Sequence, residues 1–241
     1  MSVLGILSVG TFMFLQNSSN GYAATLGRAQ LSQEARLVIA RITSELRTAL
    51  PRSVRVSGSC LEYVPTEAAS NYVSLATTSA ASVFESWPLD PLPGAGVLRV
   101  AVYPDSTLYE LTNPGPVSPI VNIAAPDVNN RVTVSFASAH QFRNESPQQK
   151  YFVVSDPVSY CLSDSNLFRY QGYGFVATQP TVGALPSTLP GRALFAEGVS
   201  GGFVVNAASL SRNAEVALDL TFSRRGELVA MNHLVQVRNV P

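Results

Sequence analysis

The stretch VLGILSVGTFMFLQ, residues 3–16, carries no charge and is almost wholly apolar, and a second segment with helical periodicity follows it closely. A helix that spans a bilayer needs about 20 apolar residues, so this stretch is too short to cross a membrane by itself. Between the two segments, QNSSNG at residues 16–21 is compatible with a kink, a local unwinding or the cap of a separate helix. The way these two segments join decides the fold of the whole amino-terminal part.

The second segment has the pattern of an amphipathic helix that ends before Pro51. Proline pushes the residue before it out of the helical conformation, so we predict a helix over about residues 22–50. Arg41 and Glu45 form an i, i+4 pair on its flank. Ile39 and Leu50 fall on the apolar stripe together with six residues at spacings of three and four. We expect these six to pack on the protein's own domain: Leu31, Ala35, Val38, Ile42, Leu46 and Ala49.

If the apolar start continues this helix, the joined helix is about 70 Å long at 1.5 Å per residue, and its first half must project from the domain. A projecting apolar half needs lipid or neighbouring helices around it. The side chains expected in that role are Leu4, Ile6, Leu7, Val9, Phe12, Phe14, Leu15 and Leu26. The alternative is a secretory signal peptide cleaved near Ala24, but no Lys or Arg precedes the apolar run and the first is Arg28.

After Pro51 the pattern changes to short runs with period two, which indicates strands buried on one face. These runs are SVRVSG, CLEYVP, YVSLA, GVLRVAVYP, TLYEL, RVTVSFAS, KYFVVSD, VSYCLS, NLFRYQGYGF, EVALDLTFSR and ELVAMNHLVQVRNV. Residues 164–166 and 224–227 are predicted hairpin turns, and residues 77–96 and 177–191 long loops. The expected fold is α+β, with a long helix over residues 1–50 on one antiparallel β-sheet domain over residues 51–241.

The composition describes an ordered, weakly charged protein. Its 16 basic and 16 acidic residues cancel, and only 13% of residues are charged, about half the usual share. No basic run is present, so we expect no nucleic-acid partner. Cys60 and Cys161 predict a single disulfide, with two unrelated buried thiols as the alternative. A disulfide that closes a loop this long would stabilise the fold by about 3–5 kcal/mol and would place the domain outside the cytosol.

Two arrangements of residues resemble catalytic sites. GVSGG at residues 198–202 matches G-x-S-x-G, and Ser200, Asp219 and His233 follow in α/β-hydrolase order. The following FVVNAASL has the pattern of a strand and not of the helix that a hydrolase site needs. A chymotrypsin-like site is excluded because His140 and Ser200 are too few residues apart in the sequence to lie on two barrels. We therefore predict that the protein is not an enzyme. We also expect no cofactor and no metal, since SDPVSYCLSDSN lacks the dense spacing of a calcium loop; a calcium ion near Asp156 and Asp164 is the alternative.

Segments spread over most of the chain point to a known family. They are LGILSVGT, ARLVIARITSELRTALPRSVRVSG, CLEYVP, YFVVSDPVSYCL, LFRYQGYG and VQVRNVP. In these segments the chain resembles type IV pilins and pseudopilins, in particular minor pilins of the mannose-sensitive haemagglutinin type and the related J-type minor pseudopilins of type II secretion. Members of the family begin with a basic leader and a Gly-Phe-Thr-Leu-Ile-Glu-like junction. This sequence has no such junction, so we expect its apolar start to be the rear part of an anchor helix.

The resemblance implies a subunit that takes part in pilus biogenesis and assembly through contacts of its helix and its domain. Before assembly such a protein is held in the inner membrane by its helix, with the domain in the periplasm; after assembly it belongs to the extracellular pilus. The implied partners are other minor and major pilins, the inner-membrane assembly machinery and the membrane itself. The alternatives are a minor pseudopilin of a type II secretion system and a secreted β-rich adhesin domain with a signal peptide.

Overall fold

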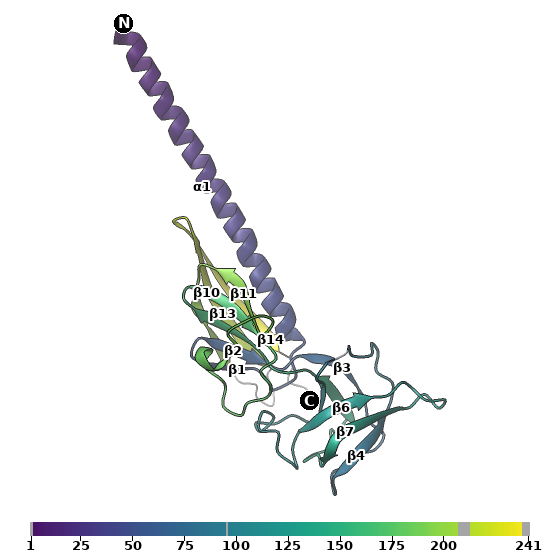
Figure 1. Ribbon diagram of the computed structural model, residues 1–241. Coiled ribbons are helices and arrows are strands. Elements are labelled where there is room, and N and C mark those ends of the chain that lie inside the picture. Colours follow the sequence, from purple (N-terminus) through teal and green to yellow (C-terminus); the bar gives the residue numbers. More distant parts are fainter. Residues whose placement is uncertain (1, 95, 207–212, 238–241) are drawn as a thin grey trace.

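The computed structural model describes residues 2–94, 96–206 and 213–237 (Figure 1). Helix α1 spans Ser2–Arg47 as a single helix, so the polar stretch at residues 16–21 does not divide it. Its first half extends away from the β-rich part of the molecule, and its second half lies along it (Figure 1). Within the described residues, no helix is both long and apolar enough to cross a membrane.

Helix α1 ends at Arg47, three residues before the predicted end at Leu50. The prediction was wrong here because the chain leaves the helix to pair with a later segment: the Leu50 N–H donates to the Val64 carbonyl over 2.8 Å. Ala49, expected on the last helical turn, lies beyond the helix in a β-bridge with Pro65. It is nevertheless buried, as the pattern predicted.

The strands of the described residues form three antiparallel sheets. A five-stranded sheet has the order β1 (Arg55–Ser57), β2 (Cys60–Tyr63), β9 (Val158–Ser163), β10 (Asn166–Tyr170) and β11 (Arg192–Glu197). A three-stranded sheet has the order β12 (Val199–Asn206), β13 (Ala214–Arg224) and β14 (Glu227–Val237). A six-stranded sheet has the order β3 (Thr66–Asn71), β8 (Lys150–Val154), β5 (Arg99–Ala101), β6 (Val117–Ile123), β7 (Val132–His140) and β4 (Ala81–Ser86). A short 3₁₀ helix, η1, spans Val182–Ala184.

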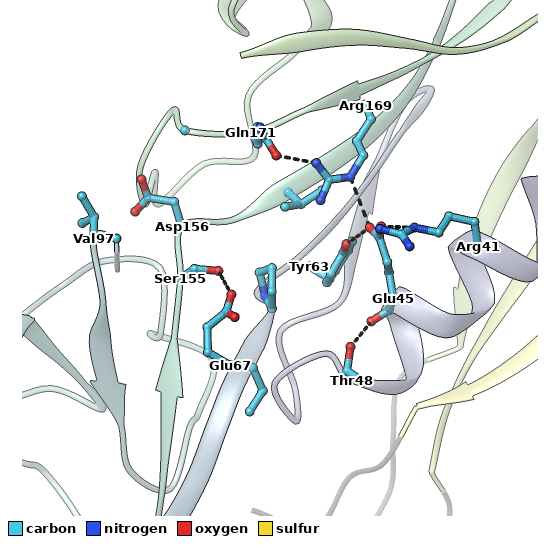
Figure 2. A pocket seen from close by; sticks show the side chains of 15 residues that line it. Arg41, Glu45, Thr48, Tyr63, Glu67, Val97, Ser155, Asp156, Arg169 and Gln171 are labelled. Atoms are coloured by element: carbon cyan, nitrogen blue, oxygen red, sulfur yellow. Dashed lines mark hydrogen bonds and ion pairs between the residues drawn. The ribbon is translucent and has the colours of Figure 1, made fainter. Parts of the chain in front are cut away.

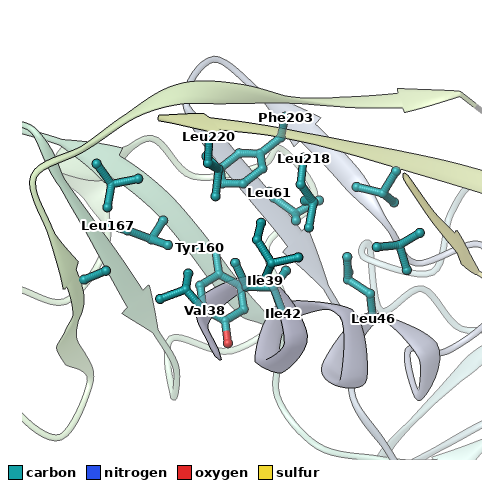
Figure 3. Close-up of a cluster of buried hydrophobic side chains, with 14 of the residues drawn as sticks. Val38, Ile39, Ile42, Leu46, Leu61, Tyr160, Leu167, Phe203, Leu218 and Leu220 are labelled. Carbon is teal, nitrogen blue, oxygen red and sulfur yellow. The ribbon is translucent and has the colours of Figure 1, made fainter. Parts of the chain in front are cut away.

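The second half of α1 packs into one hydrophobic core with the five-stranded and three-stranded sheets (Figure 3). From the sheets this core takes Leu61, Tyr160 and Leu218 among others. All six residues expected to pack on the domain belong to this core: Leu31, Ala35, Val38, Ile42 and Leu46 from the helix, and Ala49 from the segment just after it. Burial of a large apolar side chain contributes about 1.5–3 kcal/mol, so this stripe fixes the helix on the sheets. The α+β class predicted from the sequence is confirmed to this extent.

The six-stranded sheet forms a second lobe that closes on itself. A β-bridge joins Tyr72, just after β3, to Ser86 at the end of β4. The Trp87 N–H also donates to the Asn71 carbonyl over 3.0 Å, so the two edge strands of this sheet meet. Its interior has its own hydrophobic core, in which the Phe136 ring contacts the rings of Phe84, His140 and Phe142. The β-rich part therefore consists of two lobes, a division that the sequence pattern did not indicate.

Both predicted hairpin turns are confirmed. Asp164 and Ser165 connect β9 to β10 with φ values of 50° and 57°. Arg225 and Gly226 connect β13 to β14 with φ values of 50° and 86°. Two consecutive positive φ values are the mark of the type I′ turn, whose twist matches that of antiparallel strands.

Other strand predictions were wrong for identifiable reasons. TLYEL at residues 107–111 forms turns, because the Asp105 carboxylate accepts hydrogen bonds from the N–H and hydroxyl of Thr107. YVSLA at residues 72–76 follows β3 instead of forming it, and β4 lies inside a predicted loop. Strand β6 was missed because it contains Pro119, which donates no ladder hydrogen bond. There the Ser118 hydroxyl accepts the Val100 N–H over 2.9 Å in place of a backbone carbonyl.

Candidate functional site

The predicted disulfide between Cys60 and Cys161 is confirmed. The two residues lie directly opposite each other on β2 and β9, with their Cα atoms 4.1 Å apart. Both side chains are buried, and the bond joins positions 101 residues apart in the sequence. It therefore ties the first strands after the helix to the middle of the five-stranded sheet.

Glu45, on the last turns of α1, is the centre of a polar cluster that holds the helix on the five-stranded sheet (Figure 2). Its carboxylate accepts hydrogen bonds from the phenols of Tyr63 on β2 and Tyr160 on β9, the latter over 2.9 Å. The Nε of Arg169 on β10 donates to the Glu45 carboxylate over 3.2 Å, and the Nε of Arg41 donates to it over 2.8 Å. The predicted Arg41–Glu45 pair is thus one part of a larger network.

The network shifts the pKa values of its members. Burial by itself would raise the pKa of Glu45, but the Tyr63 hydrogen bond, the Arg169 charge and the Tyr160 hydrogen bond together hold it below its usual value. Burial and the neighbouring Glu45 carboxylate raise the pKa of Tyr63 and of Tyr160. Glu45 is therefore ionised and both phenols are neutral donors at neutral pH, which is the arrangement that the observed contacts require.

Two ion pairs hold the other side of α1 to the β13–β14 hairpin. Arg28 lies 3.1 Å from Glu227, and Arg224 lies 2.9 Å from Glu34. All four side chains are partly or largely exposed, so each pair contributes about 0–1 kcal/mol. They orient the hairpin along the helix more than they stabilise it.

A second buried ion pair joins β1 to β2. The Arg55 guanidinium lies 2.6 Å from the Glu62 carboxylate, which is fully buried, and stacks over the Tyr109 ring at 3.5 Å. Tyr109 in turn donates its hydroxyl to the Ser53 carbonyl over 2.6 Å. Because Tyr109 packs in a cluster with residues of the six-stranded sheet, this contact joins the two lobes.

A cleft of about 700 Å³ lies where α1 and the two lobes meet (Figure 2). Arg41 and Arg169 line one side of it, and Glu67 and Asp156 line the other. The Glu67 carboxylate accepts the Ser155 hydroxyl over 2.7 Å. Burial raises the pKa of Asp156, and the charge of Arg99 opposes this in part. Most polar groups of the cleft bind one another, so the cleft is a structural junction between α1 and the two lobes.

The side of α1 turned away from the sheets carries large exposed apolar side chains. Tyr22, Leu26 and Leu37 are 68%, 45% and 66% exposed. At 100° per residue their positions fall within a narrow arc of the helix, on one face. The other residues expected to pack in a filament or membrane are Leu4, Ile6, Leu7, Val9, Phe12, Phe14 and Leu15, and their side chains lie outside those that the structure describes.

The residues of the catalytic-like pattern do not form a triad. Ser200 and Asp219 share the outer face of the three-stranded sheet, because Ser200 pairs with Thr221 and successive residues alternate faces. His233 pairs with Leu218 and therefore lies on the opposite face. His140 is buried in the other lobe, where burial lowers its pKa and its Nε2 lies 3.2 Å from the Gly115 carbonyl oxygen.

Metal-ligating side chains do not gather in the described part of the chain. No group of three or more His, Cys, Asp or Glu residues there is placed to hold an ion. Asp156 lines the cleft, whereas Asp164 lies in the β9–β10 turn, so the acidic residues near Cys161 serve separate local roles.

Sequence reasoning missed most of the Glu45 cluster. Its only local signal was the i, i+4 spacing to Arg41. Tyr63, Tyr160 and Arg169 come from three different strands, and no short-range pattern relates them to the helix. Each does fall in a segment read as a strand, but facing residues on different strands cannot be identified without the sheet order.

Comparison with known proteins found no matching family model, no matching curated protein and no matching solved structure. The resemblance to pilins therefore remains a prediction from the sequence. The molecule itself offers two surfaces with functional interest: the outward face of α1 and the junction centred on Glu45.

Proposed function

We propose that this protein is a minor pilin or pseudopilin that joins a type IV pilus through helix α1. One observation carries the proposal: a 46-residue helix packs its second half on its own sheets while its first half extends beyond them (Figure 1). A helix with a domain at one end and a free apolar part at the other suits a fibre in which helices form the core and domains the outer layer.

The first half of α1, which extends beyond the sheets, supplies the driving force for assembly. Residues 3–15 are nearly all apolar or small, and each large side chain gains about 1.5–3 kcal/mol when it leaves water. Tyr22, Leu26 and Leu37 continue this apolar character along the outward face. The partners that satisfy such a surface are lipid before assembly and the helices of other minor and major pilins after it.

The polar cluster around Glu45, at the end of the helix, fixes the orientation of the domain relative to α1. Glu45 joins α1 to three strands, and the disulfide fixes two of these strands to each other. A helix held so firmly carries its domain to a defined place in an assembly. We therefore assign the protein no catalytic role: it acts in pilus biogenesis through contacts, with its domain in the periplasm and later on the fibre.

A photo-crosslinking experiment in the cells that make the protein tests this proposal. A photoreactive phenylalanine replaces Leu26, which is exposed on α1, and a matched variant carries it at Leu189, which is 77% exposed in a loop. We expect pilin subunits among the products at position 26 and a different or empty set at position 189. Products at both positions that contain no pilin or pseudopilin would overturn the proposal.

The identity of the crosslinked subunits separates a pilus from a type II secretion system. Mass spectrometry of the mature chain separates both from a secreted domain. Cleavage near Ala24 would cut α1 in its middle, whereas an assembling subunit keeps the residues before it.

A further inference from the structure

Strand β14 is the longest open sheet edge among the described residues. All eleven of its residues pair with β13 and none pairs with another strand. In an antiparallel pair, every second residue turns its N–H and C=O away from its partner. No described residue bonds to these outward groups, so β14 offers a row of donors and acceptors.

The other edges are shorter, interrupted or closed. Strand β11 has six residues, and the register of its pairing with β10 shifts between Leu167 and Phe168. Strand β1 has only three residues, and its Arg55 donates to the Val176 and Ala177 carbonyls alongside it. Strand β12 has eight residues and lies against β1, β9 and β10 of the five-stranded sheet. The edges of the six-stranded sheet meet each other.

Strand β14 also lacks the features that protect an edge from pairing. Its sequence, ELVAMNHLVQV, contains no proline and no lysine, and Glu227 is its only acidic or basic residue apart from His233. Glu227 sits at its first position and is paired with Arg28. Natural proteins place charges, prolines or bulges on edges that must stay free, so this edge is suited to pairing.

A groove of about 570 Å³ runs between this edge and α1. Ile39 and Met231 give it an apolar floor, and Thr43, which also lines it, has a buried hydroxyl with no hydrogen-bond partner among the described residues. Arg36 and Arg47 line it as well, and neither pairs with a carboxylate of the described part of the chain. No acidic side chain lines the groove, so its charge is positive.

We propose that β14 binds an extended acidic segment of another protein, which adds a strand to the sheet along this groove. The main chain of the segment pairs with the outward groups of β14, as in other cases of strand addition. Alternate side chains of the segment point into the groove, where apolar groups meet Ile39 and Met231 and carboxylates meet Arg36 and Arg47. This site is separate from the outward face of α1 and does not depend on a pilin role.

Synthetic peptides test the site on the full chain. The probe is a peptide of about twelve residues that alternates valine or threonine with glutamate, the length of a long strand. One control peptide has lysine in place of glutamate, and another has methyl groups on alternate backbone nitrogens, which removes the ladder donors. Binding is measured by fluorescence anisotropy, and hydrogen exchange reports which amides become protected.

We expect the glutamate peptide to bind about tenfold more tightly than the lysine peptide, from two half-exposed charge pairs. The methylated peptide should lose this binding, and bound peptide should slow amide exchange along β14. The double variant Arg36→Glu, Arg47→Glu should reverse the preference, whereas Arg225→Glu, a matched charge reversal in the β13–β14 turn, should keep it.

Three results would overturn the proposal. They are equal binding of the acidic and basic peptides, binding without added protection of β14, and no binding up to about 1 mM peptide, the weakest range of specific affinity. Circular dichroism of each variant checks that the fold is intact, so a loss of binding cannot be confused with unfolding.

Discussion

The Glu45 carboxylate on helix α1 lies 3.2 Å from the Arg169 guanidinium on β10, 124 residues further along the chain. The pair is largely shielded, since the side chains are 12% and 24% exposed. It attaches the last turns of the long helix to β10 of the five-stranded sheet.

Replacement of Glu45 by glutamine should weaken the attachment of α1. The change keeps the shape of the side chain but removes the charge that Arg169 and two phenols meet, so we expect a loss of about 1–3 kcal/mol in unfolding free energy. Urea denaturation measures it. Glu34→Gln, in the exposed pair with Arg224, is the matched control and should cost less than about 1 kcal/mol. Equal losses in the two variants would contradict the role given to Glu45.

The contribution of Glu45 should depend on pH in a defined direction. Because its pKa is lower in the folded protein than in the unfolded chain, the unfolded state binds more protons as the pH falls. The stabilisation is therefore complete above the usual glutamate pKa and disappears as the pH drops through the lowered folded value. The difference in denaturation midpoint between wild type and Glu45→Gln should shrink from about pH 7 to about pH 3. A difference that stays constant would show that the charge of Glu45 is not responsible.

Removal of the disulfide should destabilise the protein strongly. The double variant Cys60→Ala, Cys161→Ala frees a loop of 101 residues, and we expect it to lose about 2–5 kcal/mol. The thermal unfolding midpoint is the measurement. Wild type should resist mild reductant in its folded state, because both cysteines are buried. A variant as stable as wild type would mean that the cross-strand bond adds nothing to the packing around it.

Two leucines of α1 allow a direct comparison of its faces. Leu31 is 1% exposed in the core, and Leu37 is 66% exposed on the outward face. Leu31→Ala should cost about 2–5 kcal/mol in unfolding free energy, and Leu37→Ala less than about 0.5 kcal/mol. Denaturation of the purified variants tests both values. If Leu37→Ala destabilises the isolated protein as much as Leu31→Ala, the outward face is not free.

The sequence predicted what depends on local periodicity. Spacings of three and four identified Leu31, Ile42 and Leu46 as core residues, and short polar turns located both hairpins. It failed where distant segments decide the outcome. The end of α1 depends on pairing with Val64. Pro119 lies in β6 where the pairing with β5 shifts register, and there the Ser118 hydroxyl accepts the Val100 N–H. The polar cluster of Glu45 could not be predicted, since its partners lie on three separate strands.

The closure of the six-stranded sheet could not be predicted from the sequence either, because it also depends on distant segments. The contact between Tyr72 and Ser86 exists only once six strands have found their order. Strand β4 lies just before the proline-rich segment at residues 88–93, and that composition favoured a loop. Cross-strand pairing with β7 overrides the local preference of these residues.

The most direct test of the central claim, that the outward face of α1 joins a pilus, is to follow the protein into sheared fibres. Cells lacking the gene are complemented with wild type or with Leu26→Asp, an exposed position where a charge leaves the folded domain undisturbed. Fibres are sheared from the surface and probed with an antibody against the β-rich part. We predict wild-type protein in the fibre fraction, and Leu26→Asp folded in the cell envelope but lost from the fibres. Wild-type protein that never enters the fibre fraction, or Leu26→Asp that enters it unchanged, would contradict the claim.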